Sequence, residues 1–207
     1  GFDDHTKLFF PEPGAAFAPP QVTEEGIDWG EGVRPATRDY TPLYDVERHE
    51  LAYDFFIHDG GIASRWALEA KVGDKLVIGG PRGSLVVPED YAWQLYVCDE
   101  SGMPALRRRL LGLRQLAVTP QVTAIVTIAD ASYKDYLADL DGFNIEWVVG
   151  HNPAFVAERL AQEKVPAEDY FIWLTGEGAV VKSLLARFED ESIDQQLVRS
   201  QAYWHSK

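Results

Sequence analysis

The chain has 207 residues and a formal net charge of −14, because 33 acidic residues outnumber 19 basic ones. This balance argues against a nucleic-acid partner, whose backbone is bound through Lys and Arg, and against an anionic membrane surface. No run approaches the roughly 20 apolar residues of a membrane span, and no secretory signal opens the chain, so we expect a cytoplasmic protein without membrane insertion.

Residues 1–90 predict a β-rich domain. Pro and Gly crowd residues 11–36, which we expect to form a long loop. Apolar and polar side chains alternate over 51–58, as is typical of a strand. Segment 72–76 is interpreted as a turn into a further strand, which 79–83 closes. Short strands at this spacing predict an antiparallel barrel or sandwich.

Residues 91–207 predict a small α/β domain, with the boundary near 88–91. The predicted strands are 95–98, 122–128, 145–149, 170–174 and 201–204, and the predicted helices are 104–113, 153–164 and 178–190. Apolar strands that alternate with helices predict a parallel sheet covered on both faces. Such a sheet binds its ligand beyond the carboxyl ends of its strands.

The tetrapeptide Arg38-Asp39-Tyr40-Thr41 places a cation, an aromatic ring and a hydroxyl on one extended segment. Alone, it could equally be an exposed strand with ordinary surface residues. The Gly-rich turn at 60–66 shifts the balance toward a flavin nucleotide, because it enters a helix whose first N–H groups can bind phosphate. Ala63 and Ser64 are the expected phosphate contacts.

The single cysteine, Cys98, excludes an intramolecular disulfide and a Cys-rich zinc or iron–sulfur site. It lies in an apolar run, where a buried side chain is a better interpretation than a nucleophile. No two His residues have metal-ligand spacing. We therefore expect no metal site and redox chemistry carried by an organic cofactor.

Several motifs occur in order over nearly the whole chain. They are Asp4-His5-Thr6-Lys7-Leu8-Phe9-Phe10-Pro11, Arg38-Asp39-Tyr40-Thr41, Asp54-Phe55-Phe56-Ile57-His58, Gly61-Ile62-Ala63-Ser64-Arg65-Trp66-Ala67, Gly79-Gly80-Pro81-Arg82-Gly83-Ser84, Asp99-Glu100-Ser101-Gly102-Met103-Pro104-Ala105, Gly176-Glu177 and Tyr203-Trp204. In these motifs the chain resembles the ferredoxin–NADP reductase superfamily and, more closely, the siderophore-interacting protein family of FAD-dependent ferric-siderophore reductases. The resemblance implies an antiparallel FAD-binding β-barrel in 1–90 and a parallel-sheet α/β domain binding NAD(P)H in 91–207.

Two departures from the family accompany this resemblance. The first barrel strands, which normally precede the Asp-His-x-Lys segment, are missing, so we expect a truncated chain or one that begins partway through its natural sequence. Pro42-Leu43-Tyr44 stands where the family often has basic residues, which weakens the expected anion-binding character of the substrate face.

On the flavin side, the resemblance implies that Arg38 pairs with the pyrophosphate of FAD and that Tyr40 lies along the ribityl chain and the ring system. Thr41 would hydrogen-bond near N5, which makes it the candidate catalytic residue. His58 and Asp54 are placed near the flavin, with Asp54 holding the His58 tautomer. Gly61 belongs to the phosphate-binding turn with Ala63 and Ser64.

On the nicotinamide side, the resemblance implies contacts from Glu100 and Ser101, with Gly176, Glu177 and the terminal Trp204 completing the cofactor-binding set. Acidic residues before a helix that begins with Pro also cap that helix, and we expect this capping to be real. The segment lacks a Gly-x-Gly-x-x-Gly fingerprint. Asp130, after the second strand, could meet a ribose hydroxyl and so slightly favours NADH over NADPH.

Lys7, His5 and, more weakly, Arg48 are the candidates for the substrate side. Catecholate ferric siderophores are strongly anionic, so a cation near the flavin edge would attract them. The alternative for Lys7 is an ordinary solvated side chain.

The expected activity is electron transfer from NADH or NADPH through FAD to the Fe(III) of a ferric siderophore, by a monomer. Two alternatives stay open: a flavin electron carrier that uses ferredoxin in place of NAD(P)H, and a siderophore-binding module without reductase activity. Fold alone does not rank them.

Overall fold

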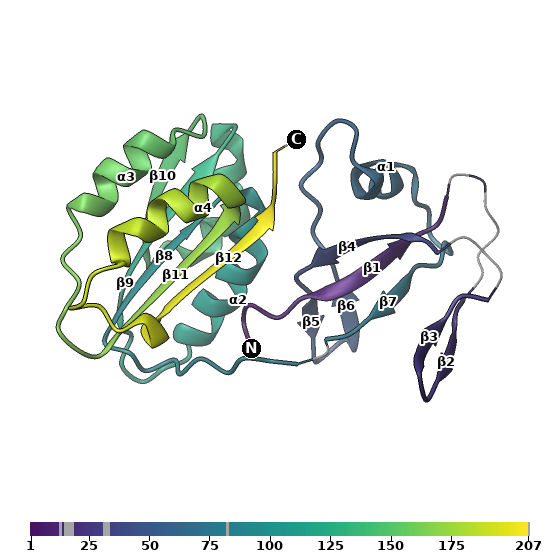
Figure 1. The fold of residues 1–207 in the computed structure, drawn as a ribbon, viewed down its shortest axis with the longest axis horizontal. Coiled ribbons are helices and arrows are strands. Elements are labelled where there is room, and N and C mark those ends of the chain that lie inside the picture. Colours follow the sequence, from purple (N-terminus) through teal and green to yellow (C-terminus); the bar gives the residue numbers. More distant parts are fainter. Residues whose placement is uncertain (13, 15–18, 31–33, 82, 207) are drawn as a thin grey trace. The chain divides into compact units, whose positions relative to one another are not determined.

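The computed structural model describes residues 1–207 except 13, 15–18, 31–33, 82 and 207. The described chain divides into two compact units (Figure 1). The first comprises Gly1 and Asp3–Leu85, and the second comprises Phe2 and Val86–Lys207. Each unit has its own sheet and its own apolar core.

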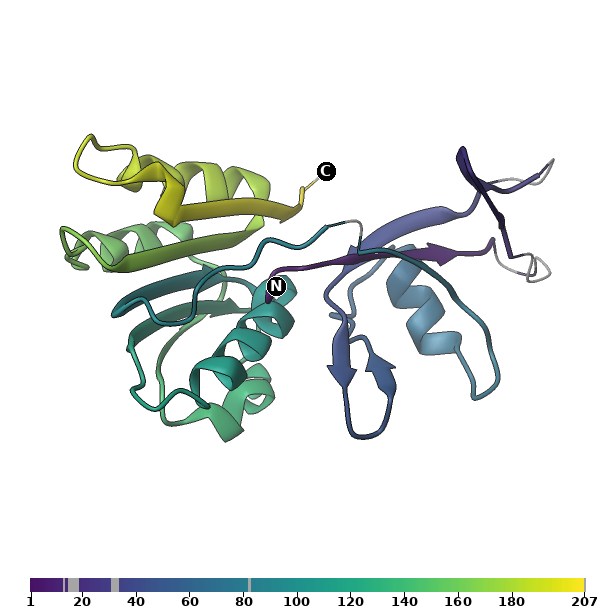
Figure 2. The same cartoon turned by 90° about the horizontal axis from the view of Figure 1, so that it is seen from below.

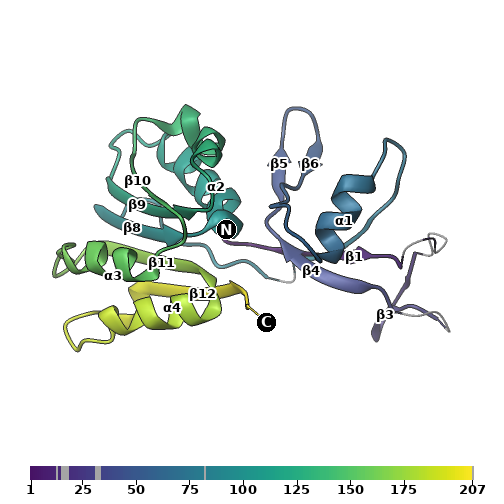
Figure 3. The same cartoon turned by 90° about the horizontal axis from the view of Figure 1, so that it is seen from above.

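Strand β1 (Thr6–Phe10) is the centre of a three-stranded antiparallel sheet in the first unit, between β4 (Ala36–Tyr40) and β7 (Val77–Gly79). Leu8 and Phe10 of β1 are fully buried and share one face because side chains two residues apart point the same way. They pack with Ala63 of helix α1 (Ile62–Glu69), which lies beside this sheet in Figure 3.

Two short antiparallel hairpins complete the described strands of the first unit. Strand β2 (Gln21–Thr23) pairs with β3 (Gly26–Asp28), and β5 (Leu43–Asp45) pairs with β6 (Glu50–Ala52). The predicted loop 11–36 is therefore wrong at 21–28, and parts of that range lie outside the described residues. The predicted strand 51–58 is wrong beyond Ala52.

The alternation in 51–58 has a different physical origin from strand pairing. The Tyr53 hydroxyl lies 2.7 Å from Thr6 Oγ1, and the Phe55 ring centroid lies 4.5 Å from that of Tyr40. Alternate side chains thus turn toward the small core while the segment itself is irregular. Alternating apolar and polar side chains show only that every second side chain is buried, and an extended loop packed against a core has the same pattern as a strand.

The second unit contains a five-stranded parallel sheet with the order β10-β9-β8-β11-β12. Its strands are β8 (Trp93–Cys98), β9 (Gln121–Ile128), β10 (Asn144–Val149), β11 (Tyr170–Glu177) and β12 (Val198–Trp204). The chain builds outward from β8 to β10 and then returns to add β11 on the other side of β8. The order therefore reverses between β8 and β11, and this reversal is where such sheets bind ligands.

Helices cover both faces of this sheet, as predicted (Figure 2). One face packs on α2 (Met103–Leu113) and the 3-10 helix η2 (Ala131–Leu140). The other packs on α3 (Pro153–Ala161) and α4 (Gly178–Leu185). Alternate residues of β8 enter the two cores, so every residue of that strand is buried.

Helix α2 begins one residue before its predicted start and ends where predicted, whereas α3 and α4 begin where predicted and end earlier. Helix α3 ends at Ala161, and α4 ends at Leu185 before a separate 3-10 turn, Ala186–Phe188. Strand β12 begins three residues before its predicted start because its pairing with β11 starts at Val198. The longest described α-helix, α2, has 11 residues, and no helix in the described parts is long and apolar enough to cross a membrane.

Arg109 of α2 is a buried guanidinium, with 2% of its surface exposed. It donates to the Tyr96 hydroxyl, the Gln94 side chain and the main-chain carbonyls of Val87 and Pro88. It also lies over the Phe2 ring, 5.2 Å from the centroid. These contacts satisfy the donors that burial would otherwise leave unpaired, so Arg109 fastens the start of the second unit to its sheet.

Trp173, on β11, is the largest fully buried side chain of the molecule as described. Its ring packs edge-on against Tyr203 and at a tilt against Tyr96. Its indole nitrogen has no hydrogen-bond acceptor among the described residues.

Candidate functional site

The flavin motif lies on β4 of the first unit. Arg38 and Tyr40 are in the strand, and Thr41 follows it directly. Tyr40 is half-buried against Phe55; this burial raises the pKa of the Tyr40 hydroxyl, and the neighbouring Arg38 partly offsets the rise. Thr41 is 7% exposed. The strand therefore holds the aromatic ring and the hydroxyl against the core and leaves the Arg38 side chain exposed.

The Gly-rich turn brings three of the predicted residues together. Ser64 Oγ accepts a hydrogen bond from the His58 main-chain N–H at 3.1 Å. A Cβ on Gly61 would lie 2.7 Å from His58 Cε1, so only glycine allows the imidazole to approach the start of α1. The Nδ1 atom of His58 lies 3.1 Å from the Asp59 carbonyl oxygen. That carbonyl can hold the tautomer, the role expected of Asp54, which is exposed.

The residues of the first unit fit a dinucleotide with a diphosphate. Arg38 donates to the Thr37 carbonyl at 2.7 Å, and no acidic side chain of the described residues forms an ion pair with it. Helix α1 begins at Gly61 without a side-chain cap, so the N–H groups of its first turn, including those of Ala63 and Ser64, keep their capacity to bind an anion. A cation and an uncapped helix start are the groups that a diphosphate requires.

The three predicted substrate-side residues have different surroundings. Lys7 of β1 forms a two-pronged ion pair with Asp39 of β4, at 2.8 and 3.0 Å, so its charge is already partly neutralised. Arg48 lies in the β5–β6 turn, 3.7 Å from Asp45. His5 is exposed just before β1. Among the described residues, no hydrogen bond or ion pair joins these three side chains to one another.

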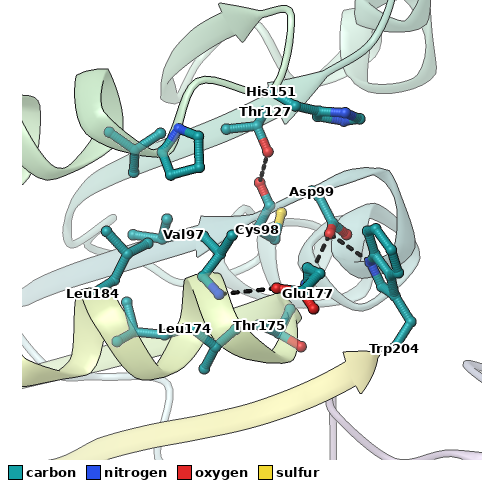
Figure 4. A pocket seen from close by; sticks show the side chains of 14 residues that line it. Val97, Cys98, Asp99, Thr127, His151, Leu174, Thr175, Glu177, Leu184 and Trp204 are labelled. Atoms are coloured by element: carbon teal, nitrogen blue, oxygen red, sulfur yellow. Dashed lines mark hydrogen bonds between the residues drawn. The ribbon is translucent and has the colours of Figure 1, made fainter. Parts of the chain in front are cut away.

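In the second unit, the predicted nicotinamide residues gather at the carboxyl ends of the parallel strands. Glu100 and Ser101 follow β8, Gly176 and Glu177 end β11, and Trp204 ends β12. A pocket of about 140 Å³ opens among these ends, between β8, β11 and the first turns of α3 and α4. Its wall includes Asp99, Glu177 and Trp204, which lie together in Figure 4. This pocket lies at the order reversal of the sheet, where a nucleotide is expected.

Glu100 is buried below the rim, with 5% of its side chain exposed. It accepts the Ala129 N–H at 2.6 Å and lies 2.8 Å from His151 Nε2. His151 lines the pocket and has a left-handed backbone, φ 42°. Glu100 therefore orients a neighbouring imidazole and joins β8 to the ends of β9 and β10.

Glu177 caps helix α4. Its carboxylate accepts the N–H groups of Ala179 and Val180 and both the N–H and the hydroxyl of Ser206. The Val180 N–H and then Ser206 hold the pKa of Glu177 below its ordinary value. Gly176, at φ 134°, has a backbone that favours glycine. These two predicted residues thus shape the rim, whatever they bind.

The acidic segment was expected to cap the helix that begins near Pro104, and this is wrong: α2 has Gly102 at its N-cap and no side-chain cap. Asp99 instead accepts the Ser101 N–H and so caps the 3-10 turn Glu100–Gly102, which precedes that helix. Asp130 does the same for Ser132, whose hydroxyl and N–H lower the pKa of Asp130. The carboxylate expected to meet a ribose hydroxyl therefore has a local partner. Cys98 is 2% exposed, and burial raises the pKa of its thiol, as expected of a structural cysteine.

Most of the pocket residues were not predicted as site residues, and Asp99, Thr127 and His151 are among them. Each lies at or just after the carboxyl end of a parallel strand. The rule that ligands bind beyond those ends points to all three, because Asp99 follows β8, Thr127 lies near the end of β9 and His151 follows β10. No group of three or more His, Cys, Asp or Glu suited to a metal ion occurs in the described residues.

Comparison with known proteins gives matches over both units. Residues 1–85 match the siderophore-interacting FAD-binding domain, and residues 91–207 match the siderophore-interacting protein family. An NADPH-dependent ferric-chelate reductase of Escherichia coli is 69% identical over the whole of this chain and 81% of its own length. A ferric vibriobactin reductase, ViuB, of Vibrio cholerae is 27% identical over 86% of this chain and 67% of its own length.

Solved structures agree with these matches. A siderophore utilization protein from T. fusca superposes with a TM-score of 0.81 at 29% identity, covering 99% of this chain and 80% of that one. A ferredoxin NADP⁺ reductase of Neisseria gonorrhoeae, at 15% identity and a TM-score of 0.63, covers 97% of this chain and 86% of its own and shows the shared fold alone. The resemblance inferred from the motifs is confirmed: the chain belongs to the siderophore-interacting protein family.

Proposed function

We propose that this protein is an FAD-dependent reductase that passes electrons from NADPH to the Fe(III) of a ferric siderophore. The observation that carries the proposal is the 69% identity, along the entire chain, to an NADPH-dependent ferric-chelate reductase. The pocket at the carboxyl ends of β8 and β11 supplies a place for the nucleotide. Residues 1–90 would hold FAD, and residues 91–207 would hold the nicotinamide nucleotide.

When bound, FAD supplies the conversion of a two-electron donor into two one-electron transfers to iron. The residues of the first unit bind and orient it. Arg38, which has no acidic partner in the described chain, grips the diphosphate together with the first turn of α1. Tyr40 would lie along the flat ring system, and Thr41, the catalytic candidate, would supply a hydroxyl for a hydrogen bond to the flavin. His58 and Gly61 shape the turn.

The second unit binds NADPH at the strand ends. Glu177 and Trp204 line the pocket, and Glu100, Ser101 and Gly176 lie at the neighbouring strand ends; we propose these five as the residues that would hold the nucleotide. The slight preference for NADH inferred from Asp130 is dropped, because the E. coli relative is named as NADPH-dependent and the Asp130 carboxylate is occupied by Ser132.

The substrate is a ferric siderophore, with iron as cargo and not as a bound cofactor. Lys7, His5 and Arg48 remain the proposed attracting cations. Siderophore oxygen ligands bind Fe(II) much more weakly than Fe(III). After reduction, iron can therefore leave the siderophore without a ligand from the protein. We place the reaction in the cytoplasm and expect a monomer in size-exclusion chromatography.

The test uses purified protein reconstituted with FAD, assayed without oxygen with a ferric catecholate and an Fe(II)-trapping dye. NADPH should bleach the flavin absorbance, and the ferric chelate should restore it while Fe(II) accumulates. Reduced ferredoxin in place of NADPH is the parallel arm for the carrier alternative. Colourless protein that binds the ferric chelate without turnover would contradict the proposal.

A further inference from the structure

Asp99 is a pocket-lining carboxylate whose hydrogen-bond partners come from the ends of three strands. Its Oδ1 accepts the N–H and the hydroxyl of Ser101, at 2.9 and 2.5 Å. Its Oδ2 accepts the Glu177 main-chain N–H at 3.1 Å and the Trp204 indole N–H at 2.8 Å. Figure 4 shows the last two contacts. One side chain at the end of β8 thus joins the ends of β11 and β12.

All four of these partners are donors, so the position requires an acceptor on both atoms of the side chain. A carboxylate provides this, whereas an amide of the same shape has one oxygen and one NH₂ group. In Asp99→Asn, either orientation would turn NH₂ against two donors. Space is also limited, because a Cβ on Gly176 would lie 2.6 Å from Asp99 Oδ2.

Trp204, which donates to Asp99, begins a segment at the pocket whose next residues are also held in place. Trp204 lines the pocket while 45% of its surface stays exposed. The next two residues dock on the start of α4: the His205 ring fills the space above Gly178, and Ser206 donates to Glu177. Segment 204–206 is therefore held by consecutive contacts to Asp99, Gly178 and Glu177.

A comparison within the chain separates local capping from this wider role. Asp130 and Asp190 occur in the same Asp-x-Ser arrangement, and each accepts the N–H and hydroxyl of the Ser two residues later. Asp99 makes those two local bonds and adds the two long-range ones. The two bonds to Ser101 account for the local turn. The contacts to Glu177 and Trp204 are not needed for such a turn, because Asp130 and Asp190 form it without contacts of that kind in the described chain.

We propose that Asp99 is a positioning residue for NADPH: by holding the Trp204 indole and the Gly176–Glu177 turn, it keeps the nucleotide pocket in its binding shape. The inference rests on the proposed function, because it takes NADPH as the ligand of this pocket. Asp99 acts through its neighbours and needs no contact with the reacting atoms.

The experiment measures NADP⁺ affinity by isothermal titration calorimetry, with no need for turnover. Asp99→Asn should weaken binding about tenfold, since it removes hydrogen bonds to a charged group. The matched control is Asp190→Asn, which loses the same local bonds away from the pocket and should bind as the wild type does. In the FAD-loaded enzyme, Asp99→Asn should raise KM for NADPH with little change in kcat and leave the oxidation of pre-reduced flavin by ferric catecholate unaffected.

A second variant keeps the test decisive if Asp99→Asn folds poorly. Trp204→Phe removes one donor, keeps an aromatic ring and leaves the other Asp99 bonds in place, so it should also weaken NADP⁺ binding. The double variant should bind about as weakly as Asp99→Asn alone, because both changes break one contact. Additive losses, or wild-type affinity in Asp99→Asn, would overturn the inference while leaving the function intact. Failure of the wild type itself to bind NADP⁺ would overturn the proposed function and the inference with it.

Discussion

The two units of this chain bury their apolar side chains on different scales. In the second unit, both faces of the parallel sheet are covered, and every residue of β8 is buried. In the first unit, a three-stranded sheet and one helix share a core whose fully enclosed members are Leu8, Phe10 and Ala63, and two hairpins leave side chains such as Val22 exposed.

The two units therefore differ in what holds them folded. In the second unit, the covered parallel sheet holds the pocket residues in place without a ligand. The first unit has less buried surface, and stabilisation grows with the apolar area removed from water. We therefore expect the first unit to unfold more readily and to gain more from its cofactor, since a ligand that binds the native state stabilises it by mass action.

The largest expected effect tests the independence of the two cores. Leu106→Ala in α2 should cost about 3 kcal/mol of unfolding free energy in the second unit, because it empties a fully buried site. Leu8→Ala should cost about as much in the first unit and should release FAD at lower urea. Urea unfolding followed by circular dichroism and flavin fluorescence would measure both. A single shared transition, shifted equally by either change, would break the comparison.

The next effect concerns the cation of the first unit. Arg38→Ala should weaken FAD binding by about 2 kcal/mol, or roughly 30-fold in Kd, because charge-assisted bonds to the diphosphate are lost. Arg108→Ala, which removes the same charge from α2, is the control and should retain FAD. Flavin retention after desalting and fluorescence titration give the values. Equal retention in the two variants would refute the assignment of Arg38.

A smaller effect is expected at the turn that ends β11. Gly176→Ala should cost at least about 1 kcal/mol, because φ is 134° there and the new Cβ would press on Asp99. Gly142→Ala places its Cβ in open space and serves as the control. Thermal unfolding would measure the loss of stability in both variants, and NADP⁺ titration would show whether the strain at Gly176 also weakens nucleotide binding. Identical stability and affinity in the two variants would contradict this prediction.

The smallest effect is a pH dependence at Glu177. Its pKa in the folded protein lies below the ordinary value of 4.5 because the Val180 N–H, and then Ser206, favour the carboxylate. The cap on α4 is therefore intact above pH 4.5 and is lost as the pH falls through the lower, folded value. Amide chemical shifts of Val180 and Ser206 should titrate in that acidic range in the wild type and not in Glu177→Gln. Titration at or above pH 4.5 would contradict the cause assigned here.

The accuracy of the sequence-based predictions follows the same division. Strands such as 122–128 and the helices between them are apolar at the right spacing, and long-range packing reinforces that local signal. In the first unit, 51–58 has a strand's alternation but leaves the ladder after Ala52, because Tyr53 and Phe55 are drawn into a small core. The alternation of apolar and polar residues alone therefore does not distinguish a paired strand from an extended loop packed against a core.

For the sites, the motifs supply the residue types and the fold supplies their partners. Glu100, Ser101 and Glu177 were predicted as contacts; all three lie at the carboxyl ends of the parallel strands, and Glu177 lines the pocket. Their hydrogen bonds could not be read from the sequence, because Asp99 meets Glu177 and Trp204 from 78 and 105 residues away. The roles of these residues toward the nucleotide stay predictions.

The indole of Trp173, enclosed and without an acceptor among the described residues, also offers an optical reporter. Tryptophan emission shifts to shorter wavelengths when no water or polar group surrounds the excited ring. The difference spectrum between wild type and Trp173→Phe should therefore contain a blue component that vanishes on melting. Melting of the larger sheet could then be followed without attaching a dye.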